Sequence, residues 1–395
     1  MATKQEENSN MPQGPISESI KIAETLDAEN IVTAFNNEYV KYYGKYVDEN
    51  KLESFIQDEL PEDLESDNVP DEMIWTVENN ENEDFIGAGA IKFDDNLAEL
   101  GSTIISPEYR GKRTEDGTGL YDELFLHRLN EAEKLVRSGE IDIVNTQLLA
   151  DKSAATQNTA HKHGFAVTGI YDKKFPVAYE GKGRVTVVDM LWADSNIENS
   201  QEEVYVPETA SELVEEALEN INQKRSDEYE EITREVLGSD AGNHESQSYS
   251  VNTKVVDGPE EDPMNFAEVS IVEDELGDYA WSDVVKEISS AQTQISNEED
   301  DYWVGISLDA NHSSGTSAAR FLEEFGFEYA GFNPGKLETS GENRDALEME
   351  YRPSDEKIAK QYINEAVQFM DAADTSYEEF DEDKTNHNNS QLIRA

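Results

Sequence analysis

Residues 97–137 read LAELGSTIISPEYRGKRTEDGTGLYDELFLHRLNEAEKLVR, and this stretch predicts a strand, a glycine-rich turn and a helix in immediate succession. The strand covers 97–106 and ends at Pro107. The helix begins at Leu120, and its apolar residues recur every three or four positions, as one buried helix face requires. The turn between them contains three glycines and three cations: Gly111, Gly117 and Gly119, with Arg110, Lys112 and Arg113.

This turn has the chemistry of an anion site. Glycines let backbone amides approach a ligand without a Cβ in the way. The start of a helix adds unpaired amides and a partial positive charge. Three clustered cations also stand out in a chain of net charge −57. We interpret 110–119 as a cradle for a pyrophosphate, with an ordinary glycine-rich turn as the alternative. The turn lacks the Gly-Lys-Ser/Thr of a Walker loop, and it follows a predicted antiparallel meander rather than a dinucleotide-binding strand.

Outward from this stretch, the first half of the chain predicts an α+β fold. Periodicity places strands at 20–25, 73–78, 85–93, 97–106, 141–149, 165–171 and 185–192, and helices at 31–60, 120–137 and 153–163. The turn at 94–96, Asp-Asp-Asn, has the composition of a hairpin. A run of antiparallel strands followed by crossovers predicts a mixed, mostly antiparallel sheet with helices on both faces.

The second half repeats this order. Strands are expected at 249–256, 266–272, 302–308, 327–332 and 346–351, and helices at 210–237, 281–295 and 314–325. SAATQNTAHKHGFAVTGIY at 153–171 matches GTSAARFLEEFGFEYAGFN at 315–333, and DMLW at 189–192 matches EMEY at 348–351. We interpret this as a tandem duplication. The expected organisation is a flexible arm (1–17), a first domain (18–195), a linker (196–203), a second domain (204–354) and an acidic helix or tail (355–395).

The run 98–113, followed by Gly117-Thr118-Gly119 and the amphipathic helix, resembles the acetyl-CoA-binding motif of the GNAT superfamily of N-acetyltransferases. The short helix ending in Gly164-Phe165 is similar to that family's second conserved block, and the element order agrees over 18–195. The resemblance implies two tandem GNAT-like domains. It also implies transfer of an acetyl group from acetyl-CoA to an amine acceptor by direct attack, without a covalent enzyme intermediate.

The resemblance also implies a site. The pantetheine arm of the cofactor would pair with the edge of strand 97–106, and a backbone amide near Ile104 or Ile105 would hold the oxyanion. Glu99 is the candidate base, with an idle surface glutamate as the alternative. The residues expected to bind acyl-CoA are Ile104, Ile105, Ser106, Arg110, Gly111, Lys112, Arg113, Gly117, Thr118, Gly119 and Ser153.

Three departures from the family pattern matter. The turn carries one extra residue between Arg113 and Gly117, so we expect a bulge with Glu115 and Asp116 turned outward, or weak cofactor binding. Ala160 stands where many members have a tyrosine that protonates the leaving thiolate, so this acid is either absent or supplied elsewhere, with Tyr171 as the candidate. In the second half the corresponding turn, 273–278, is acidic. We therefore expect a degenerate second domain without a cofactor, which packs against the first and shapes the acceptor cleft.

Composition limits the other functions. The chain has 88 acidic and 31 basic residues, spread over its 395 positions, which favours an organism with molar salt in its cytoplasm. This charge argues against nucleic acid and anionic membranes as partners. The chain has no cysteine, which excludes disulfides and thiolate chemistry, and His161 and His163 do not share a helix face, so no metal site is expected. Without an apolar leader or long apolar run, we expect a cytoplasmic protein.

The expected partners are therefore acyl-CoA and an amine acceptor whose identity the sequence leaves open. Whether the chain forms a homo-oligomer is also left open. The competing hypothesis from another class is a non-catalytic module that senses acyl-CoA or binds a partner. The extra turn residue and Ala160 favour this alternative, whereas the intact cation cluster favours the enzyme.

Overall fold

The computed structural model describes residues 18–23, 27, 29–34, 73–80, 85–94, 96–114, 117–150, 155–176, 184–197, 203–238, 245, 247–256, 266–274, 277–295, 302–339 and 342–351. The expected arm, most of the first predicted helix, Ser153 and the expected tail lie outside these residues.

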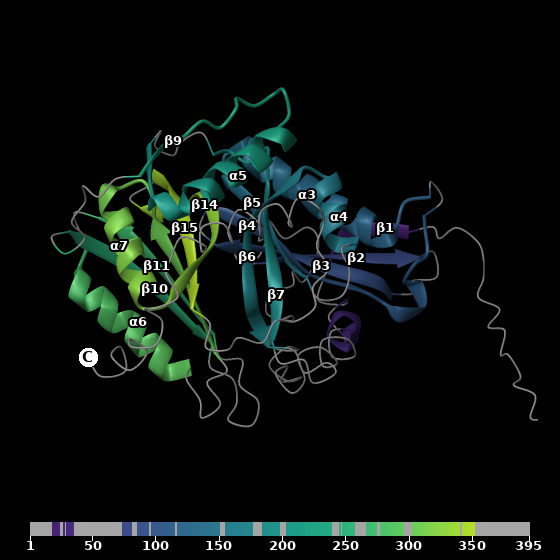
Figure 1. Ribbon diagram of the computed structural model, residues 1–395. Helices are drawn as coiled ribbons and strands as arrows, with labels where there is room; N and C mark the ends of the chain where they lie inside the picture. Colours follow the sequence, from purple (N-terminus) through teal and green to yellow (C-terminus); the bar gives the residue numbers. More distant parts are fainter. Residues whose placement is uncertain are drawn as a thin grey trace, which may run out of the picture.

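Thirteen strands of the described residues form one sheet, in the order β1-β2-β3-β4-β5-β7-β6-β14-β15-β13-β11-β10-β12 (Figure 1). Their bounds are β1 Glu18–Ile22, β2 Met73–Asn80, β3 Phe85–Asp94, β4 Leu97–Ile105, β5 Ile143–Leu149, β6 Phe165–Pro176, β7 Arg184–Trp192, β10 Ser248–Val256, β11 Phe266–Glu273, β12 Tyr279–Ala280, β13 Trp303–Asp309, β14 Phe327–Thr339 and β15 Glu342–Tyr351. Among these strands only β4–β5 and β11–β13 pair in parallel. The predicted mixed, mostly antiparallel α+β sheet is confirmed.

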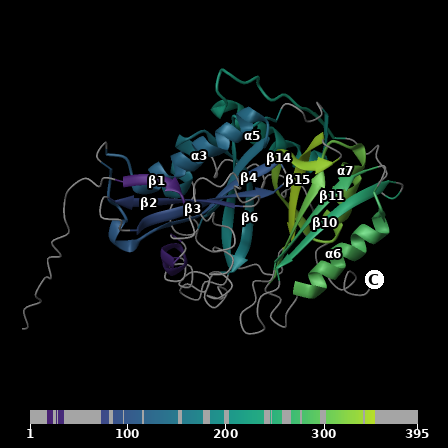
Figure 2. The same cartoon turned by 180° about the vertical axis from the view of Figure 1, so that it is seen from behind.

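Helices cover this sheet on both faces. Their bounds are α3 Leu120–Ser138, α4 Ala155–Lys162, α5 Glu208–Lys224, α6 Trp281–Ile295 and α7 Ser313–Glu324, with a short 3₁₀ helix, η3, at Pro107–Tyr109. In Figures 1 and 2, α3 and α4 lie on one side of β2 and β3, and the helical segment at 29–34 lies on the other.

The core of the first half forms where α3 packs on the sheet. Phe125, Leu129 and Ala132 share one face of α3 and are buried with Ile91 and Leu100 of the strands. Burying each of the larger side chains stabilises the fold by about 1.5–3 kcal/mol. The helix ends at a glycine in the left-handed conformation, which returns its N–H to the last turn. The predicted apolar face of this helix is therefore confirmed.

The two central hairpins of the sheet, one from each half, share one pairing register. In the β6–β7 hairpin Phe165 lies opposite Trp192, and in the β14–β15 hairpin Phe327 lies opposite Tyr351. A bulge follows at the same place in both, and after it Gly169 pairs with Asp189 as Gly331 pairs with Glu348. The strand parts of the matched sequence segments, 165–171 and 327–333, thus occupy matching positions in the two hairpins.

The halves join edge to edge between β6 and β14, where Gly331 pairs with Gly169. A Cβ at position 331 would lie 2.5 Å from the carbonyl oxygen of Thr168, so the close approach of these strands requires glycine there. Helix α5 packs across this seam, against both β6 and β14. A buried ion pair between Arg234 and Asp345, at 2.8 Å, adds to the same region.

Two predicted boundaries are wrong for physical reasons. The helix expected to reach residue 237 ends at Lys224, because Arg225 turns away and donates to the carbonyls of Ala193 and Ser195. The chain then forms β9 (Glu235–Leu237), which pairs in parallel with β8 (Glu203–Tyr205). Strands β14 and β15 also extend beyond their apolar cores, because they continue to pair with each other through Thr339 and Glu342.

Candidate functional site

Strand β4 is bulged in its second half. Ala90 pairs with Gly101 and Ala88 pairs with Ile104, so β4 has an extra residue between these two pairs. Ser102, inside the bulge, has a φ of +50°, which is uncommon for a residue other than glycine. Holding a residue in such a conformation costs about 1–3 kcal/mol and is frequent at functional sites.

The bulge lies where β4 separates from β5. The two strands pair only from Leu97↔Ile143 to Glu99↔Asn145. The hydroxyl of Thr146 then donates to the carbonyl of Leu100 at 2.7 Å, and no further β4–β5 pairing occurs within the described residues. The strand edge beyond Glu99 is therefore not paired with β5.

Ile105 presents its backbone toward this unpaired edge. The amide of Ser106 donates to Ile86 of β3 at 2.8 Å, and backbone groups of successive strand residues point in opposite directions. Ser106 and Ile104 therefore direct their backbone groups toward β3, and Ile105 directs its own away. The Ile105 carbonyl accepts a hydrogen bond from the Arg110 side chain at 2.9 Å. Of the three predicted strand residues, Ile105 has the geometry that pairing with an added strand needs.

The glycine-rich turn closes on itself. The amide of Gly117 donates to the carbonyl of Thr114 at 3.0 Å, and the amide of Thr118 donates to the Thr114 hydroxyl at 3.1 Å. The amide of Thr114 in turn donates to the carbonyl of Thr118 at 2.9 Å. Two predicted cradle amides, those of Gly117 and Thr118, thus bond to Thr114 of the same turn. Glu115 and Asp116 lie outside the described residues.

The cations of the turn also contact it. Arg113 donates to the Gly117 carbonyl, and the Lys112 ammonium lies 4.6 Å from the centre of the Tyr109 ring. Gly111 adopts a φ of +76° at the surface. Gly119 is the N-cap of α3 and provides no side-chain cap for the first amides of the helix, which begin beside this cation cluster. An anion bound at this turn would therefore depend on the helix start and the cations.

Arg128 is a site residue that the sequence reasoning missed. It is fully buried on α3 and donates to the carbonyls of Ala90 and Gly101 and to the hydroxyl of Thr103, at 2.6–3.1 Å. It thereby holds β3 and the bulged part of β4 together. A Cβ on Gly89 would lie 2.5 Å from the guanidinium carbon, so Gly89 makes room for it. The available signal was a charged residue at a position of α3 that belongs to its apolar face.

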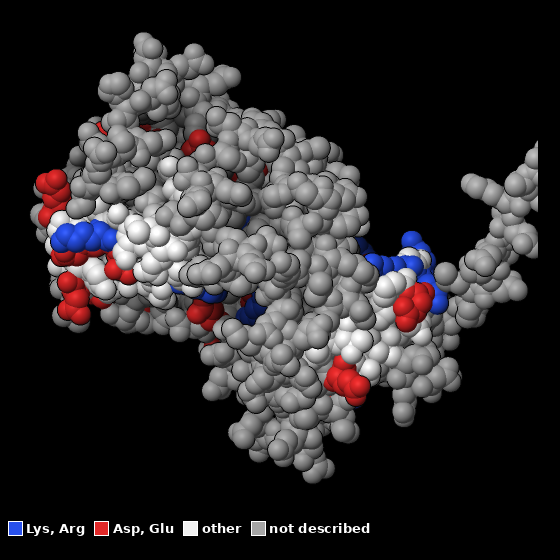
Figure 3. Space-filling model, turned by 90° about the horizontal axis from the view of Figure 1, so that it is seen from below, with Lys and Arg blue, Asp and Glu red and all other residues white. Residues whose placement is uncertain are grey.

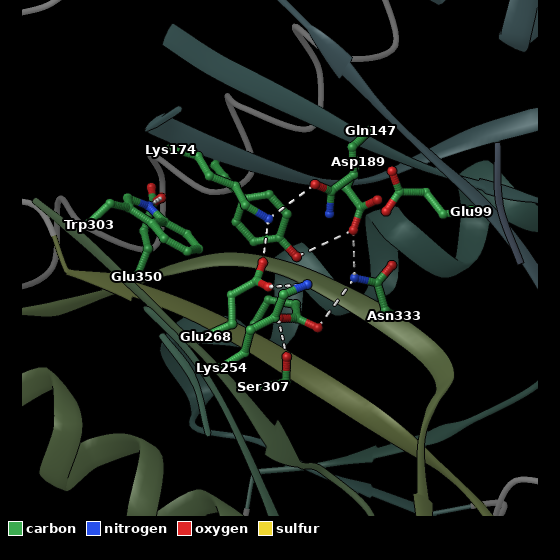
Figure 4. A network of polar contacts seen from close by, with 12 residues as sticks. Glu99, Gln147, Lys174, Asp189, Lys254, Glu268, Trp303, Ser307, Asn333 and Glu350 are labelled. Atoms are coloured by element: carbon green, nitrogen blue, oxygen red, sulfur yellow. Dashed lines mark hydrogen bonds and ion pairs between the residues drawn. The ribbon is translucent and has the colours of Figure 1, made fainter. Parts of the chain in front are cut away.

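The face of the sheet opposite α3 carries a polar cluster (Figure 4). The register places Glu99 beside Asn145 of β5 and Gln147 beside Asp189 of β7, all on one face. Glu99 is half-buried, and its nearest charged contact is Lys92 at 3.5 Å. This position suits the predicted base, since Glu99 is the last β4 residue that pairs with β5.

Tyr171 lies on β6, with β7 and β5 between it and β4. Its hydroxyl donates to Asp189 Oδ2 at 3.3 Å, and burial raises the pKa of both groups. The structure therefore does not place Tyr171 next to Ile105. Ala160, at the position of the family's tyrosine, is fully buried in the core.

The polar cluster continues across the seam into the second half. Buried Lys174 donates to Gln147 at 3.0 Å and to Glu268 at 2.6 Å, and Lys336 donates to Glu348 at 2.8 Å. These contacts were not predicted. The sequence signal was a single acid within the apolar strand β7, Asp189, and the alternation of acidic and apolar residues in β15, as in Glu348-Met349-Glu350.

No family model matches this chain. A search of curated proteins also returned no match.

Solved structures resemble part of the chain. A GNAT-family acetyltransferase from Streptococcus pneumoniae is 19% identical, with a TM-score of 0.34, over 44% of this chain and 99% of its own. A Vibrio cholerae spermidine N-acetyltransferase in complex with CoA and spermine is 17% identical, with a TM-score of 0.33, over 45% and 96%. The ribosomal-protein-S18-alanine N-acetyltransferase of Escherichia coli is 15% identical, with a TM-score of 0.32, over 44% and 92%.

The described part of the chain contains no cluster of histidine and acidic side chains arranged to hold a metal ion. None of the described helices is long and apolar enough to span a membrane.

Proposed function

We propose that this chain is an acyl-CoA-dependent N-acyltransferase of the GNAT type, with its transfer site in residues 18–195. The observation that carries the proposal is the parallel β4–β5 pair that ends after Glu99. Beyond that point a bulged β4 presents the backbone of Ile105, and a cationic turn leads directly into the start of α3. An extended pantetheine arm fits such an edge as an added strand, with its pyrophosphate at the helix start.

The proposed reaction is direct transfer. The amine nitrogen forms a bond to the thioester carbonyl carbon, and the carbon–sulfur bond breaks to release the CoA thiolate. The amide of Ile105 polarises the carbonyl oxygen and stabilises its developing charge. An amine that binds as its ammonium first loses one proton to Glu99, directly or through a water, and attacks as the neutral amine. After the attack the nitrogen loses a second proton to water, and the thiolate takes up one proton from water. Tyr171, the acid predicted from the sequence, is separated from β4 by β5 and β7 and donates its hydroxyl to Asp189, so the proposed reaction does not route the proton through it.

The second half, 204–354, is proposed to be a degenerate copy of the first. Its strands repeat the parallel pair and the bulged hairpin of the first half. At the position of the phosphate turn, however, the amide of Asp274 donates to Ser248 and that of Gly277 donates to Asp274. A Cβ on Gly277 would lie 2.4 Å from the Tyr249 backbone, so this turn packs tightly against β10. Such an acidic, closed turn does not accommodate a pyrophosphate.

Calorimetric titration of acetyl-CoA in molar KCl tests the site. We expect Lys112→Glu with Arg113→Glu to weaken binding by about tenfold or more, because charge-assisted contacts to the phosphates are lost. The matched control is Lys134→Glu with Lys286→Glu, which reverses the same number of exposed charges elsewhere. Equal effects of the two pairs, or none, would overturn the proposed cradle.

A non-catalytic acyl-CoA sensor is the second candidate, and the closed turn at Thr114–Thr118 favours it. Turnover separates the two functions. The enzyme predicts CoA release from acetyl-CoA that depends on an added amine. Tight acetyl-CoA binding without amine-dependent release, across a panel of primary amines, would support the sensor.

A further inference from the structure

Asp189 has an unsatisfied buried oxygen. The residue is fully buried in β7, and its Oδ2 accepts hydrogen bonds from Tyr171 at 3.3 Å and Asn333 at 3.2 Å. Its Oδ1 has no hydrogen-bond partner among the described residues, and neither does Oδ1 of buried Asn145 on the neighbouring strand. Buried acceptors are rarely left without a donor, so a group with N–H or O–H donors is expected at this position.

These acceptors lie on the face of the sheet that also carries Glu99. Glu99 pairs with Asn145 at the last contact of β4 with β5, and Asp189 lies on the same face, opposite Gln147. In Figure 4 the carboxylates of Glu99 and Asp189 point toward one another. Two carboxylates and an amide side chain thus share this face of the sheet, on β4, β5 and β7, beside the end of the β4–β5 pairing.

The chemistry of Glu99, Asn145 and Asp189 indicates which kind of ligand they would bind. Carboxylate and amide oxygens accept hydrogen bonds and attract positive charge. The nearby ammonium groups form their ion pairs with other carboxylates, Lys174 with Glu268 and Lys336 with Glu348, and their charges also act on Asp189 without a hydrogen bond to it. An alkylammonium group satisfies the free oxygens with its N–H donors and its charge, whereas an anion does not.

We propose that Asp189 binds the acceptor amine, and that Asn333 of the second half orients the Asp189 carboxylate for it. This inference rests on the proposed acyltransferase function. The Thr168 hydroxyl donates to the Asn333 carbonyl oxygen at 2.6 Å, which fixes the amide so that its nitrogen faces Asp189. The second half, which lacks a phosphate turn of its own in this proposal, thereby contributes the positioning residue Asn333 to the site of the first half.

The test compares Asp189→Asn with the parent chain, using n-butylamine as the probe. We expect the KM for n-butylamine to rise about tenfold or more, because a charged hydrogen-bond partner is lost. The affinity for acetyl-CoA should stay unchanged. The matched control is Asp309→Asn, a buried carboxylate four strands away, roughly 19 Å at the usual strand spacing. It should leave the KM unaltered.

Asn333→Ala tests the positioning role. It should also raise the KM, but add nothing to Asp189→Asn in the double variant, because both act on one interaction. A merely structural effect of Asn333 would instead add to that of Asp189.

Two results would overturn the inference. One is an unchanged KM in folded Asp189→Asn, and the other is additive effects in the double variant. Calorimetric titration with n-butylammonium chloride alone separates this inference from the proposed function. One outcome is that the parent chain binds the amine but not acetyl-CoA, and that Asp189→Asn abolishes the amine binding. This outcome would support the amine site and refute the acyltransferase. Absence of amine binding and of amine-dependent turnover would refute the amine site.

Discussion

Single residues decide how β3, β4 and α3 are held together. Arg128 occupies the space that a side chain on Gly89 would need, and it binds the bulged strand through backbone carbonyls. We expect Gly89→Ala to lower the free energy of unfolding by about 1–3 kcal/mol, since overpacking a fixed core group forces it to move. Denaturant unfolding measures this. The control is Gly119→Ala, where the nearest atom lies 4.0 Å away and φ is −75°. A comparable loss in both variants would contradict the assignment.

The ion pair of Lys174 and Glu268 gives a second prediction at this scale. Burial alone would raise the pKa of Glu268, but the Lys174 ammonium lowers it to about 2 from its usual 4.5. A carboxylate with a lowered pKa in the folded state stabilises the fold fully above its unfolded pKa, and the contribution is lost as the pH falls through the folded value. We therefore expect this contribution to disappear between pH 4.5 and about 2.

The variant Glu268→Gln isolates that contribution. The stability difference between parent and variant, measured by urea unfolding, should be largest at neutral pH and shrink as the pH is lowered from 4.5. The exposed pair of Lys286 and Asp283 provides the control, and Asp283→Asn should change little at any pH. A difference for Glu268→Gln that grows on acidification would refute the assignment.

At the scale of elements, the turn before α3 determines how an anion is bound. The Thr114 hydroxyl accepts a hydrogen bond from the amide of Thr118. The sequence analysis had assigned Thr118 to cofactor binding. Thr114→Val keeps the shape and removes this acceptor. We expect acetyl-CoA affinity to rise by about two- to tenfold, the range of a single hydrogen bond. Titration calorimetry measures this affinity. The matched control is Thr293→Val on α6, which removes a hydroxyl that donates to the Ser289 carbonyl and should leave the affinity unchanged. Weaker binding by Thr114→Val would show that the closed turn supports the ligand.

The elements themselves could largely be predicted from the sequence. Strands β2, β3 and β4 and helices α3 and α6 follow from local periodicity, which determines which residues face a core. The end of α5 could not be predicted, because the contacts of Arg225 with Ala193 and Ser195 connect residues about 30 positions apart. Local propensity continues a helix there, and tertiary hydrogen bonds end it.

At the scale of the whole molecule, the seam between β6 and β14 joins the two halves into one sheet. A Cβ on Gly331 would lie 2.5 Å from a backbone oxygen and 2.6 Å from Gly169 Cα, atoms that cannot move aside. A Cβ on Gly169 would meet its nearest atoms at 3.4 Å. We expect Gly331→Ala to destabilise the protein by about 1–3 kcal/mol, and clearly more than Gly169→Ala. Thermal unfolding compares them, and the reverse order would contradict this seam.

The overall charge gives a second prediction at this scale. Acidic side chains appear at both ends of the described surface in Figure 3 rather than in one patch, and the whole chain carries −57 charges. Raising ionic strength from 0.1 to 1 M shortens the Debye length from about 10 to about 3 Å. We expect the urea midpoint to rise over this range of KCl as self-repulsion is screened. A midpoint that falls or stays constant would refute the proposed adaptation to molar salt.

The sequence by itself determined the α+β class, most strands and helices, the cationic turn and the match between the two halves, because these depend on residues close together in the chain. The tertiary structure alone decided that Thr114 closes that turn, that Arg128 is buried between strands, and that Asn333 meets Asp189 from 144 residues away. The reason is register. Which side chains face each other across the seam depends on strand alignment, and a shift of one residue would turn each of them to the other face.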